Sequence, residues 1–157
     1  VPGWVRNDVM DGDLYSYTDE HKPAVSLKVN GKSVNHEIVD GYITLEENNW
    51  QRNDKISITF DMPVRKVVSN ELVKANKGKM ALERGPLVFC AEEADNPKGI
   101  LNSQVPADEI FDYSYEQDLL GGVGKITSPT LTAIPYYAWA HRGNGEMAVW
   151  LNKVPVQ

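Results

Sequence analysis

The stretch 131–151, LTAIPYYAWAHRGNGEMAVWL, carries the strongest structural pattern in the chain. Two apolar segments, 131–140 and 146–151, lie on either side of the polar turn Gly143-Asn144-Gly145. Apolar runs joined by a turn of this composition are typical of paired strands. We therefore predict a hairpin with an unusually large aromatic surface.

Alternating apolar residues mark two further strands upstream. Residues 25–29 and 56–60 both change between apolar and polar at every step, which is typical of half-buried strands. Asn30-Gly31 follows the first strand directly and favours a type I′ hairpin turn, since both central residues of that turn need positive φ. Asp40-Gly41 predicts a second turn, followed by a strand over 42–45.

The middle of the chain predicts more strands and one short helix. Strands are expected over 64–69, 79–83 and 87–91, and the last is continuously apolar, so both of its faces should be covered. The segment 70–78 is the best helical candidate, because Asn70 could cap it and Gly78 could occupy the left-handed position after its end. No strand is predicted with certainty between Asn96 and Ser114.

Many short strands separated by turns indicate an all-β protein. We expect two small β-sandwich (jelly-roll-like) units packed together, with at most one short helix. A change in composition near Arg84-Gly85-Pro86 places a first sandwich at 1–85 and a smaller one at 86–151, followed by a tail at 152–157 that could return to the first. A unit as small as the second buries only about 60% of its surface, so it should lean on the first.

Composition limits the partners. The chain has 157 residues, 41% of them hydrophobic and 24% charged, as in soluble globular proteins. A net charge of −6 argues against a nucleic-acid partner, which requires a basic surface. No apolar run reaches the roughly 18–20 residues that span a bilayer, so no membrane partner is expected. The chain starts at Val1 rather than Met, and we expect it to begin partway through a longer protein.

The residues that could bind a metal are few and far apart in the sequence. They are Cys90, His21, His36 and His141. A structural zinc site needs about four such ligands at close spacing, so no metal site is predicted. Asp8, Asp11 and Asp13 form an acidic loop that lacks the EF-hand pattern, and a solvated turn is favoured over a calcium site.

The sequence offers few candidate catalytic residues, and none of them has the surroundings that catalysis requires. Cys90 lies in an apolar strand, which raises the pKa of a thiol and hides it, whereas reactive thiols need an open electropositive site. Paired carboxylates can hydrolyse glycosides, and three adjacent pairs are present, but neighbouring residues of a strand point to opposite faces. The pairs are Glu46 with Glu47, Glu92 with Glu93, and Asp108 with Glu109. No catalytic or cofactor-binding residue is assigned, although a weaker alternative is an enzyme that uses Glu83 or Glu92.

Six aromatic residues could form either a sugar-stacking platform or the packing surface between domains. They are Trp4, Trp50, Tyr136, Tyr137, Trp139 and Trp150. A platform needs several coplanar, exposed rings. We favour packing in the core or at an interface for these residues.

A set of motifs along nearly the whole chain resembles one enzyme family. The motifs are Val1-Pro2-Gly3-Trp4, Val29-Asn30-Gly31-Lys32, Gly41-Tyr42-Ile43-Thr44, Met62-Pro63-Val64-Arg65, the run 81–88 with Cys90-Ala91-Glu92, and 131–151. In this order they are similar to the C-terminal region of the β-L-arabinofuranosidase-like glycoside hydrolases, families 127 and 146. The segment 13–17 resembles members from gut Bacteroides-type bacteria.

The resemblance implies a division of labour. In that family an (α/α)₆ barrel comes first and carries a zinc-bound cysteine nucleophile, held by a Glu and three Cys, and two β-sandwiches follow. With Cys90 alone, this chain cannot supply such a site, so zinc is expected in the catalytic barrel and no cofactor in this chain. The expected function is noncatalytic support of that barrel, its partner in the same polypeptide, with a homodimer and plant-type glycans as further candidate partners. The alternative is a carbohydrate-binding module that stacks arabinan-type glycans on Trp and Tyr rings.

Overall fold

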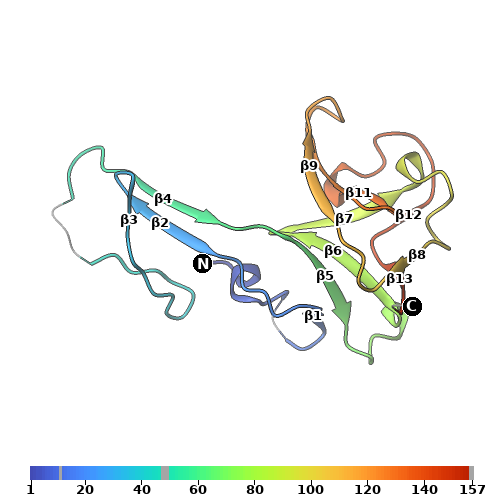
Figure 1. The fold of residues 1–157 in the computed structure, drawn as a ribbon, viewed down its shortest axis with the longest axis horizontal. Coiled ribbons are helices and arrows are strands. Elements are labelled where there is room, and N and C mark those ends of the chain that lie inside the picture. Colours follow the sequence, from blue (N-terminus) through green and yellow to red (C-terminus); the bar gives the residue numbers. More distant parts are fainter. Residues whose placement is uncertain (11, 47–49, 156–157) are drawn as a thin grey trace.

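The protein consists almost entirely of β-strands and turns (Figure 1). The computed structural model describes residues 1–10, 12–46 and 50–155. The strands are Tyr15–Tyr17 (β1), Val25–Val29 (β2), Lys32–Ser33 (β3), Ile56–Phe60 (β4), Val64–Ser69 (β5), Lys79–Arg84 (β6), Leu87–Glu92 (β7), Gln104–Pro106 (β8), Asp112–Glu116 (β9), Val123–Thr127 (β10), Thr132–Pro135 (β11), Met147–Ala148 (β12) and Leu151–Val154 (β13). Helical structure in the described ranges is limited to short 3₁₀ turns at Gly3–Arg6 (η1), Lys74–Asn76 (η2), Glu93–Asp95 (η3) and Tyr136–Ala138 (η4). The predicted all-β class is confirmed.

The strands form one large curled sheet and one small sheet. The large sheet has ten strands, seven of them on the path β1-β5-β6-β7-β11-β10-β9; β12 pairs with β7, β13 pairs with β6, and β8 pairs with β13. The small sheet has the order β3-β2-β4 and extends away from the large one (Figure 1). The chain passes from the small sheet to the large one between β4 and β5. The division after residue 85 remains a prediction; Gly85 lies in the turn between β6 and β7, and Asn152 in β13 pairs with Lys79 in β6.

The small sheet forms where the alternating patterns predicted it. β2 and β4 pair antiparallel over their full lengths, and β3 follows β2 after the Asn30-Gly31 turn. The φ angles of Asn30 and Gly31 are 49° and 79°, as a type I′ turn requires. The second predicted turn, at Asp40-Gly41, is also present, with positive φ at both residues and a bridge between Val39 and Tyr42.

The strand expected over 42–45 is wrong, since only Tyr42 makes a β-bridge there. An apolar alternating pattern forms a strand only where a neighbour supplies hydrogen bonds. In the described residues no strand runs beside 43–45.

The core lies in the large sheet around β6 and β7. Phe89, Met80 and Leu82 are almost completely buried, together with Ile126 and Ile134 from β10 and β11. The last four residues of β7 are buried, as predicted for its apolar run, but its first two are exposed. Strands 64–69, 79–83 and 87–91 thus form where they were expected.

The tight turn between β6 and β7 requires glycine. Gly85 has a φ of +58°, and a Cβ atom there would lie 2.6 Å from the sulfur of Met62. A side chain at this position would therefore meet both backbone strain and a steric clash. This turn brings β7 directly back along β6.

The helix predicted over 70–78 is wrong, and only the three-residue turn η2 forms there. The Asn70 side chain accepts a hydrogen bond from the Leu72 backbone N–H at 3.0 Å, which closes a local turn in place of a helical cap. Leu72 is 84% exposed, so the segment has no apolar face packed on the core. Two turns of helix without such packing are unstable.

The hairpin predicted within 131–151 is also wrong. β11 and β12 do not pair with each other; both pair with β7, β11 at Phe89 and Cys90 and β12 at Ala91 and Glu92. The β6–β7 ladder ends at Phe89, so the backbone groups beyond it need other partners. β12 and β13 supply them, on β7 and β6 respectively.

Two strands lie in the region where the sequence predicted none with certainty. β8 pairs parallel with β13, and β9 pairs antiparallel with β10. β9 is largely exposed, and its Tyr, Ser and Asp residues do not follow an apolar alternation. Its strand form therefore depends on the ladder with β10.

Candidate functional site

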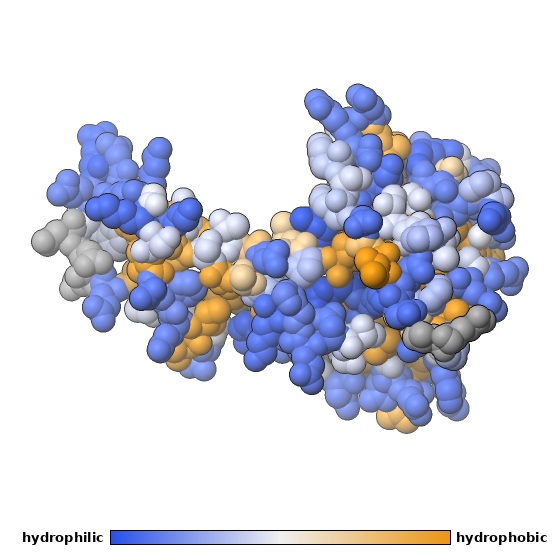
Figure 2. Space-filling model, in the orientation of Figure 1, coloured by the Kyte–Doolittle hydropathy of each residue, from blue (hydrophilic) through white to orange (hydrophobic). Residues whose placement is uncertain are grey.

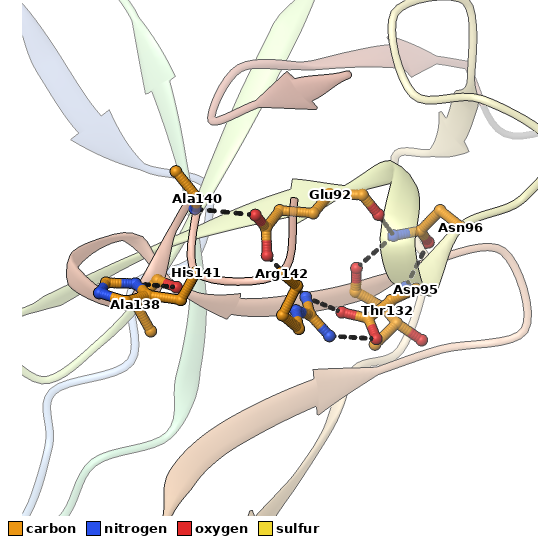
Figure 3. Close-up of polar contacts among 8 residues, drawn as sticks. All are labelled: Glu92, Asp95, Asn96, Thr132, Ala138, Ala140, His141 and Arg142. Carbon is orange, nitrogen blue, oxygen red and sulfur yellow. Dashed lines mark hydrogen bonds and ion pairs between the residues drawn. The ribbon is translucent and has the colours of Figure 1, made fainter. Parts of the chain in front are cut away.

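A largely buried ion-pair cluster joins the last part of the chain to the end of β7 (Figure 3). Arg142 donates from Nη2 to Oε2 of Glu92 at 2.6 Å and from Nη1 to Oδ1 of Asp95 at 2.7 Å. Its Nη2 also lies 2.5 Å from Oδ2 of Asp95, so the guanidinium is held as a fork. The hydrogen bonds that Arg142 donates to Asp95 and Glu92 raise the pKa of Arg142 above its usual range, and the group stays charged.

The carboxylate of Glu92 is the most deeply buried member of this cluster. The residue is 6% exposed. Its Oε1 accepts a hydrogen bond from the backbone N–H of Ala140 at 3.0 Å, while Oε2 pairs with Arg142. A buried carboxylate with a hydrogen-bond partner on each oxygen anchors Ala140 and Arg142 to the end of β7.

Asn96 extends the cluster to β11. Its Nδ2 donates to the carbonyls of Glu92 and Thr132, both at 2.8 Å, and its Oδ1 accepts from the Thr132 N–H at 2.9 Å (Figure 3). In the same view His141 contacts the carbonyl of Ala138 through Nδ1 at 3.1 Å. Polar contacts therefore lie on both sides of the aromatic turn η4, at Thr132 before it and at His141 after it.

A hollow of about 180 Å³ lies beside this cluster. It is lined by Trp139 and by residues of two loops, 92–94 and 142–146. Trp139 is 42% exposed, and its ring lies parallel to that of Tyr136, with 7° between the planes and 6.1 Å between the centroids. The hollow therefore combines an aromatic wall with polar and charged groups.

Two glutamates shape the polar side of the hollow. Oε2 of Glu93 accepts from the Glu146 N–H at 2.9 Å, and Oε2 of Glu146 accepts from the N–H groups of Ile100 and Leu101 at 2.8 and 3.2 Å. The two bonds to backbone N–H groups lower the pKa of Glu146, so it is ionised at neutral pH. These contacts fix both side chains before any ligand arrives.

The six aromatic candidates do not form one platform. Trp4 packs edge-on against Phe60 at 5.8 Å, and Trp150 stacks on Tyr15 at 5.6 Å. Trp50 precedes β4 and is 43% exposed. Tyr136, Tyr137 and Trp139 lie together on and beside η4, all of them exposed.

The candidate catalytic groups are poorly placed for chemistry. Cys90 is 1% exposed, and burial raises the pKa of its thiol to about 11, so the nucleophilic thiolate is disfavoured. Glu83 accepts a hydrogen bond from the Tyr17 hydroxyl at 3.1 Å, and burial raises the pKa of its carboxyl. Glu92 faces Arg142, whereas Glu93 is exposed.

The remaining acidic candidates have local roles or lie outside the described residues. Glu109 holds the turn at Thr130, accepting from its hydroxyl at 2.9 Å. Glu47 and Asp11 lie outside the described ranges, so the pair Glu46–Glu47 and the loop of Asp8, Asp11 and Asp13 stay predictions. Among residues 1–10, 12–46 and 50–155, no group of three or more His, Cys, Asp or Glu side chains is arranged to hold a metal ion.

Arg142 and Asp95 were not among the residues singled out from the sequence. Arg142 lies 50 residues from Glu92 and 47 from Asp95, so no local spacing links them. In the sequence, Arg142 is a single arginine next to a glycine-rich turn in an otherwise aromatic stretch. This setting does not show which carboxylates the arginine pairs with.

The fold is that of a known class of carbohydrate-active enzyme regions. Residues 64–152 match the family model described as the glycoside hydrolase family 127 C-terminal domain, and residues 1–62 match the β-L-arabinofuranosidase GH127 middle domain. The chain therefore belongs to glycoside hydrolase family 127, as the sequence motifs predicted.

Individual relatives agree with this family. The chain is 32% identical to a non-reducing end β-L-arabinofuranosidase of Bifidobacterium longum subsp. longum, over 96% of this chain and 25% of the relative. It superimposes on a solved GH127 β-arabinofuranosidase with a TM-score of 0.90 and 40% identity, covering 98% of this chain and 27% of that one. A GH127 β-L-arabinofuranosidase of Geobacillus stearothermophilus T6 gives a TM-score of 0.75 and 34% identity, over 83% of this chain and 25% of that one.

The chain thus spans about a quarter of the length of these relatives. Their named activity belongs to proteins about four times as long as the part they share with this chain. In the part of the chain that the structure describes, no helix is long and apolar enough to cross a membrane.

Proposed function

We propose that this chain is the noncatalytic β-sheet region of a bacterial β-L-arabinofuranosidase-like glycoside hydrolase, and that it supports an (α/α)₆ catalytic barrel in the same polypeptide. The observation that carries this proposal is an apolar sheet face that the described residues leave half uncovered. It is the face of the small sheet formed by β2 and β4. Family membership and the quarter-length match support the same assignment.

The register of the small sheet puts its apolar side chains on one face. Leu27 lies opposite Ile58, and Val29 lies opposite Ile56, so the four side chains share that face. The other face carries polar residues such as Ser57 and Thr59. This pattern is that of a sheet with one side packed on a core.

The apolar face is nevertheless only partly covered. η1 covers one end, where Trp4 packs on Phe60, and Leu27 is 2% exposed. Ile56 and Ile58 are 52% and 47% exposed. Figure 2 shows apolar atoms at the surface of the small sheet. An uncovered apolar face of this kind marks a contact with another domain, and the barrel of the same enzyme is the partner that the family supplies.

The chemistry of hydrolysis is assigned to the barrel. The zinc-bound cysteine nucleophile of the family requires several cysteines, and this chain has Cys90 alone, buried in β7. The role left for this chain is to bury apolar surface and to hold the barrel in place.

Ile58→Asp tests the supporting role, with Thr59→Asp as the matched control on the opposite face. In the isolated chain both substitutions should change the free energy of unfolding by less than about 1 kcal/mol, since Ile58 is 47% exposed and Thr59 is exposed as well. In a polypeptide that joins this chain to a family 127 barrel, Ile58→Asp should lower the unfolding midpoint by several degrees, because a carboxylate would then be buried without a partner. The measurement is thermal unfolding by calorimetry.

Two outcomes would count against the support role. The first is an equal effect of Ile58→Asp and Thr59→Asp in the joined protein, which would mean that the apolar face stays in water. The second is a large loss of stability from Ile58→Asp in the isolated chain, which would mean that the face is already buried.

A further inference from the structure

We propose that the hollow beside Trp139 binds one neutral sugar ring of a glycan. This binding site is separate from the support role, which could hold whether or not the hollow takes a sugar. The site is formed by the indole of Trp139, the carboxylates of Glu93 and Glu146, and the turn Gly143-Asn144-Gly145.

The aromatic wall suits the C–H face of a sugar. Trp139 is 42% exposed and is kept in place by the parallel ring of Tyr136. A flat apolar surface bordered by polar groups fits a molecule that has an apolar ring face and hydroxyls around its edge. Tyr136 begins η4 and Trp139 follows it; the next residue, Ala140, donates its backbone N–H to Glu92 of the cluster, and His141 contacts the carbonyl of Ala138.

The polar rim offers acceptors for hydroxyl groups. Glu93 and Glu146 each use Oε2 to hold backbone N–H groups, which leaves Oε1 as the oxygen able to accept from a ligand. The amide of Asn144 is exposed and can donate as well as accept. Hydroxyl groups of a sugar are matched donors for these oxygens.

The rim is pre-organised by its own contacts. Glu93 and Glu146 bond reciprocally, since Glu93 N–H donates to the Glu146 carbonyl and Glu146 N–H donates to the Glu93 carboxylate, both at 2.9 Å. Gly145 comes so close to Glu93 that a Cβ there would lie 3.1 Å from its Oε2. Gly143 has a φ of +99°, which favours glycine. A site fixed in advance loses little entropy on binding.

The charge of the lining and the volume of the hollow both favour a single uncharged sugar ring as the ligand. The cation in the lining, Arg142, is already engaged by Glu92 and Asp95, so the ligand meets the negative charges of Glu93 and Glu146. An acidic sugar would be repelled. The volume of about 180 Å³ is below that of pockets for drug-sized ligands, which start at about 300 Å³.

Titration of the ¹⁵N-labelled chain with L-arabinose, D-xylose and D-glucuronate, observed at the four tryptophan indole N–H signals, tests the proposal. A neutral pentose should shift the Trp139 signal in a saturable way, with affinity in the millimolar range, and should leave the Trp4 and Trp150 signals unchanged. Glucuronate should bind at least tenfold more weakly. Trp139→Ala should reduce the pentose affinity about tenfold or more, as monitored at backbone amides of 143–146.

Trp50→Ala is the matched control, because Trp50 is exposed to the same degree, at 43%, and lies outside the hollow. It should leave the affinity unchanged. Glu93→Gln keeps the shape of the rim and should weaken binding several-fold while the spectrum stays that of a folded protein. The proposal is overturned if neither pentose shifts the signals of the hollow, if Trp139→Ala and Trp50→Ala act alike, or if glucuronate binds as tightly as the pentoses.

Discussion

Replacing Arg142 with alanine is expected to lower the free energy of unfolding by about 3 kcal/mol. The substitution leaves the carboxylate of Glu92, 6% exposed, without its cation, and removes the bidentate contact to Asp95. Breaking a buried ion pair from one side costs about 3–5 kcal/mol, and the lower end applies because 17% of the Arg142 side chain is exposed. Urea denaturation of the chain, followed by tryptophan fluorescence, measures the change.

Arg6→Ala is the matched control for this prediction. Arg6 also pairs with a carboxylate, that of Asp8 at 3.6 Å, but both side chains are about half-exposed. Removing this surface pair should change the stability by less than about 1 kcal/mol. If the two arginine variants lose similar amounts, Arg142 is not a buried anchor, and the proposed rigidity of the hollow beside Trp139 loses its basis.

Replacing Phe89 with alanine should cost still more, about 4 kcal/mol. Phe89 is 1% exposed and lies where β7 pairs with both β6 and β11. Truncating a buried phenylalanine leaves a cavity in addition to the lost apolar contact, and such changes cost about 3–5 kcal/mol. This loss is a large fraction of the roughly 5–15 kcal/mol by which domains are usually stable.

Val88→Ala is the matched control for Phe89→Ala. It also truncates a residue of β7, but at a site that is partly exposed, so it separates the effect of burial from that of strand propensity. Val88 is the preceding residue of β7, points to the opposite face, and is 37% exposed. Its truncation should cost about 1 kcal/mol or less. Equal unfolding midpoints for Phe89→Ala and Val88→Ala in urea would contradict the arrangement of the core around β6 and β7.

The sequence predicted the local part of this fold well. The alternation of 25–29 and 56–60 and the Asn30-Gly31 turn are signals contained within a few residues, and each forms as expected. The apolar runs that become β5, β6 and β7 also lie close together along the chain, so their antiparallel order follows from short connections. The family models match the same segments, which lie within residues 1–62 and 64–152.

The sequence pattern did not predict which strands pair when they lie far apart along the chain. β11 and β12 have the appearance of a hairpin, yet both pair with β7, more than 40 residues earlier. The helix predicted over 70–78 failed because Leu72 finds no core to pack on. Arg142 could not be recognised because its carboxylates come from the far end of β7 and from η3.

The aromatic candidates show how burial separates residues of one type. Trp4 and Trp150 pack against other rings, whereas Tyr136 and Trp139 stay exposed and parallel beside a hollow. The sequence alone could not tell the packed rings from the exposed ones, because the difference depends on which rings the sheets cover.

The hydrolysis of a β-L-arabinofuranoside by the purified, folded chain alone is the most direct measurement of the noncatalytic assignment. We predict no release of arabinose above the rate in buffer, with or without added zinc, because the thiol of Cys90 is buried and the oxygens of Glu92 are engaged by Arg142 and Ala140. Turnover by this chain that disappears in Glu92→Gln or Glu83→Gln would contradict the assignment.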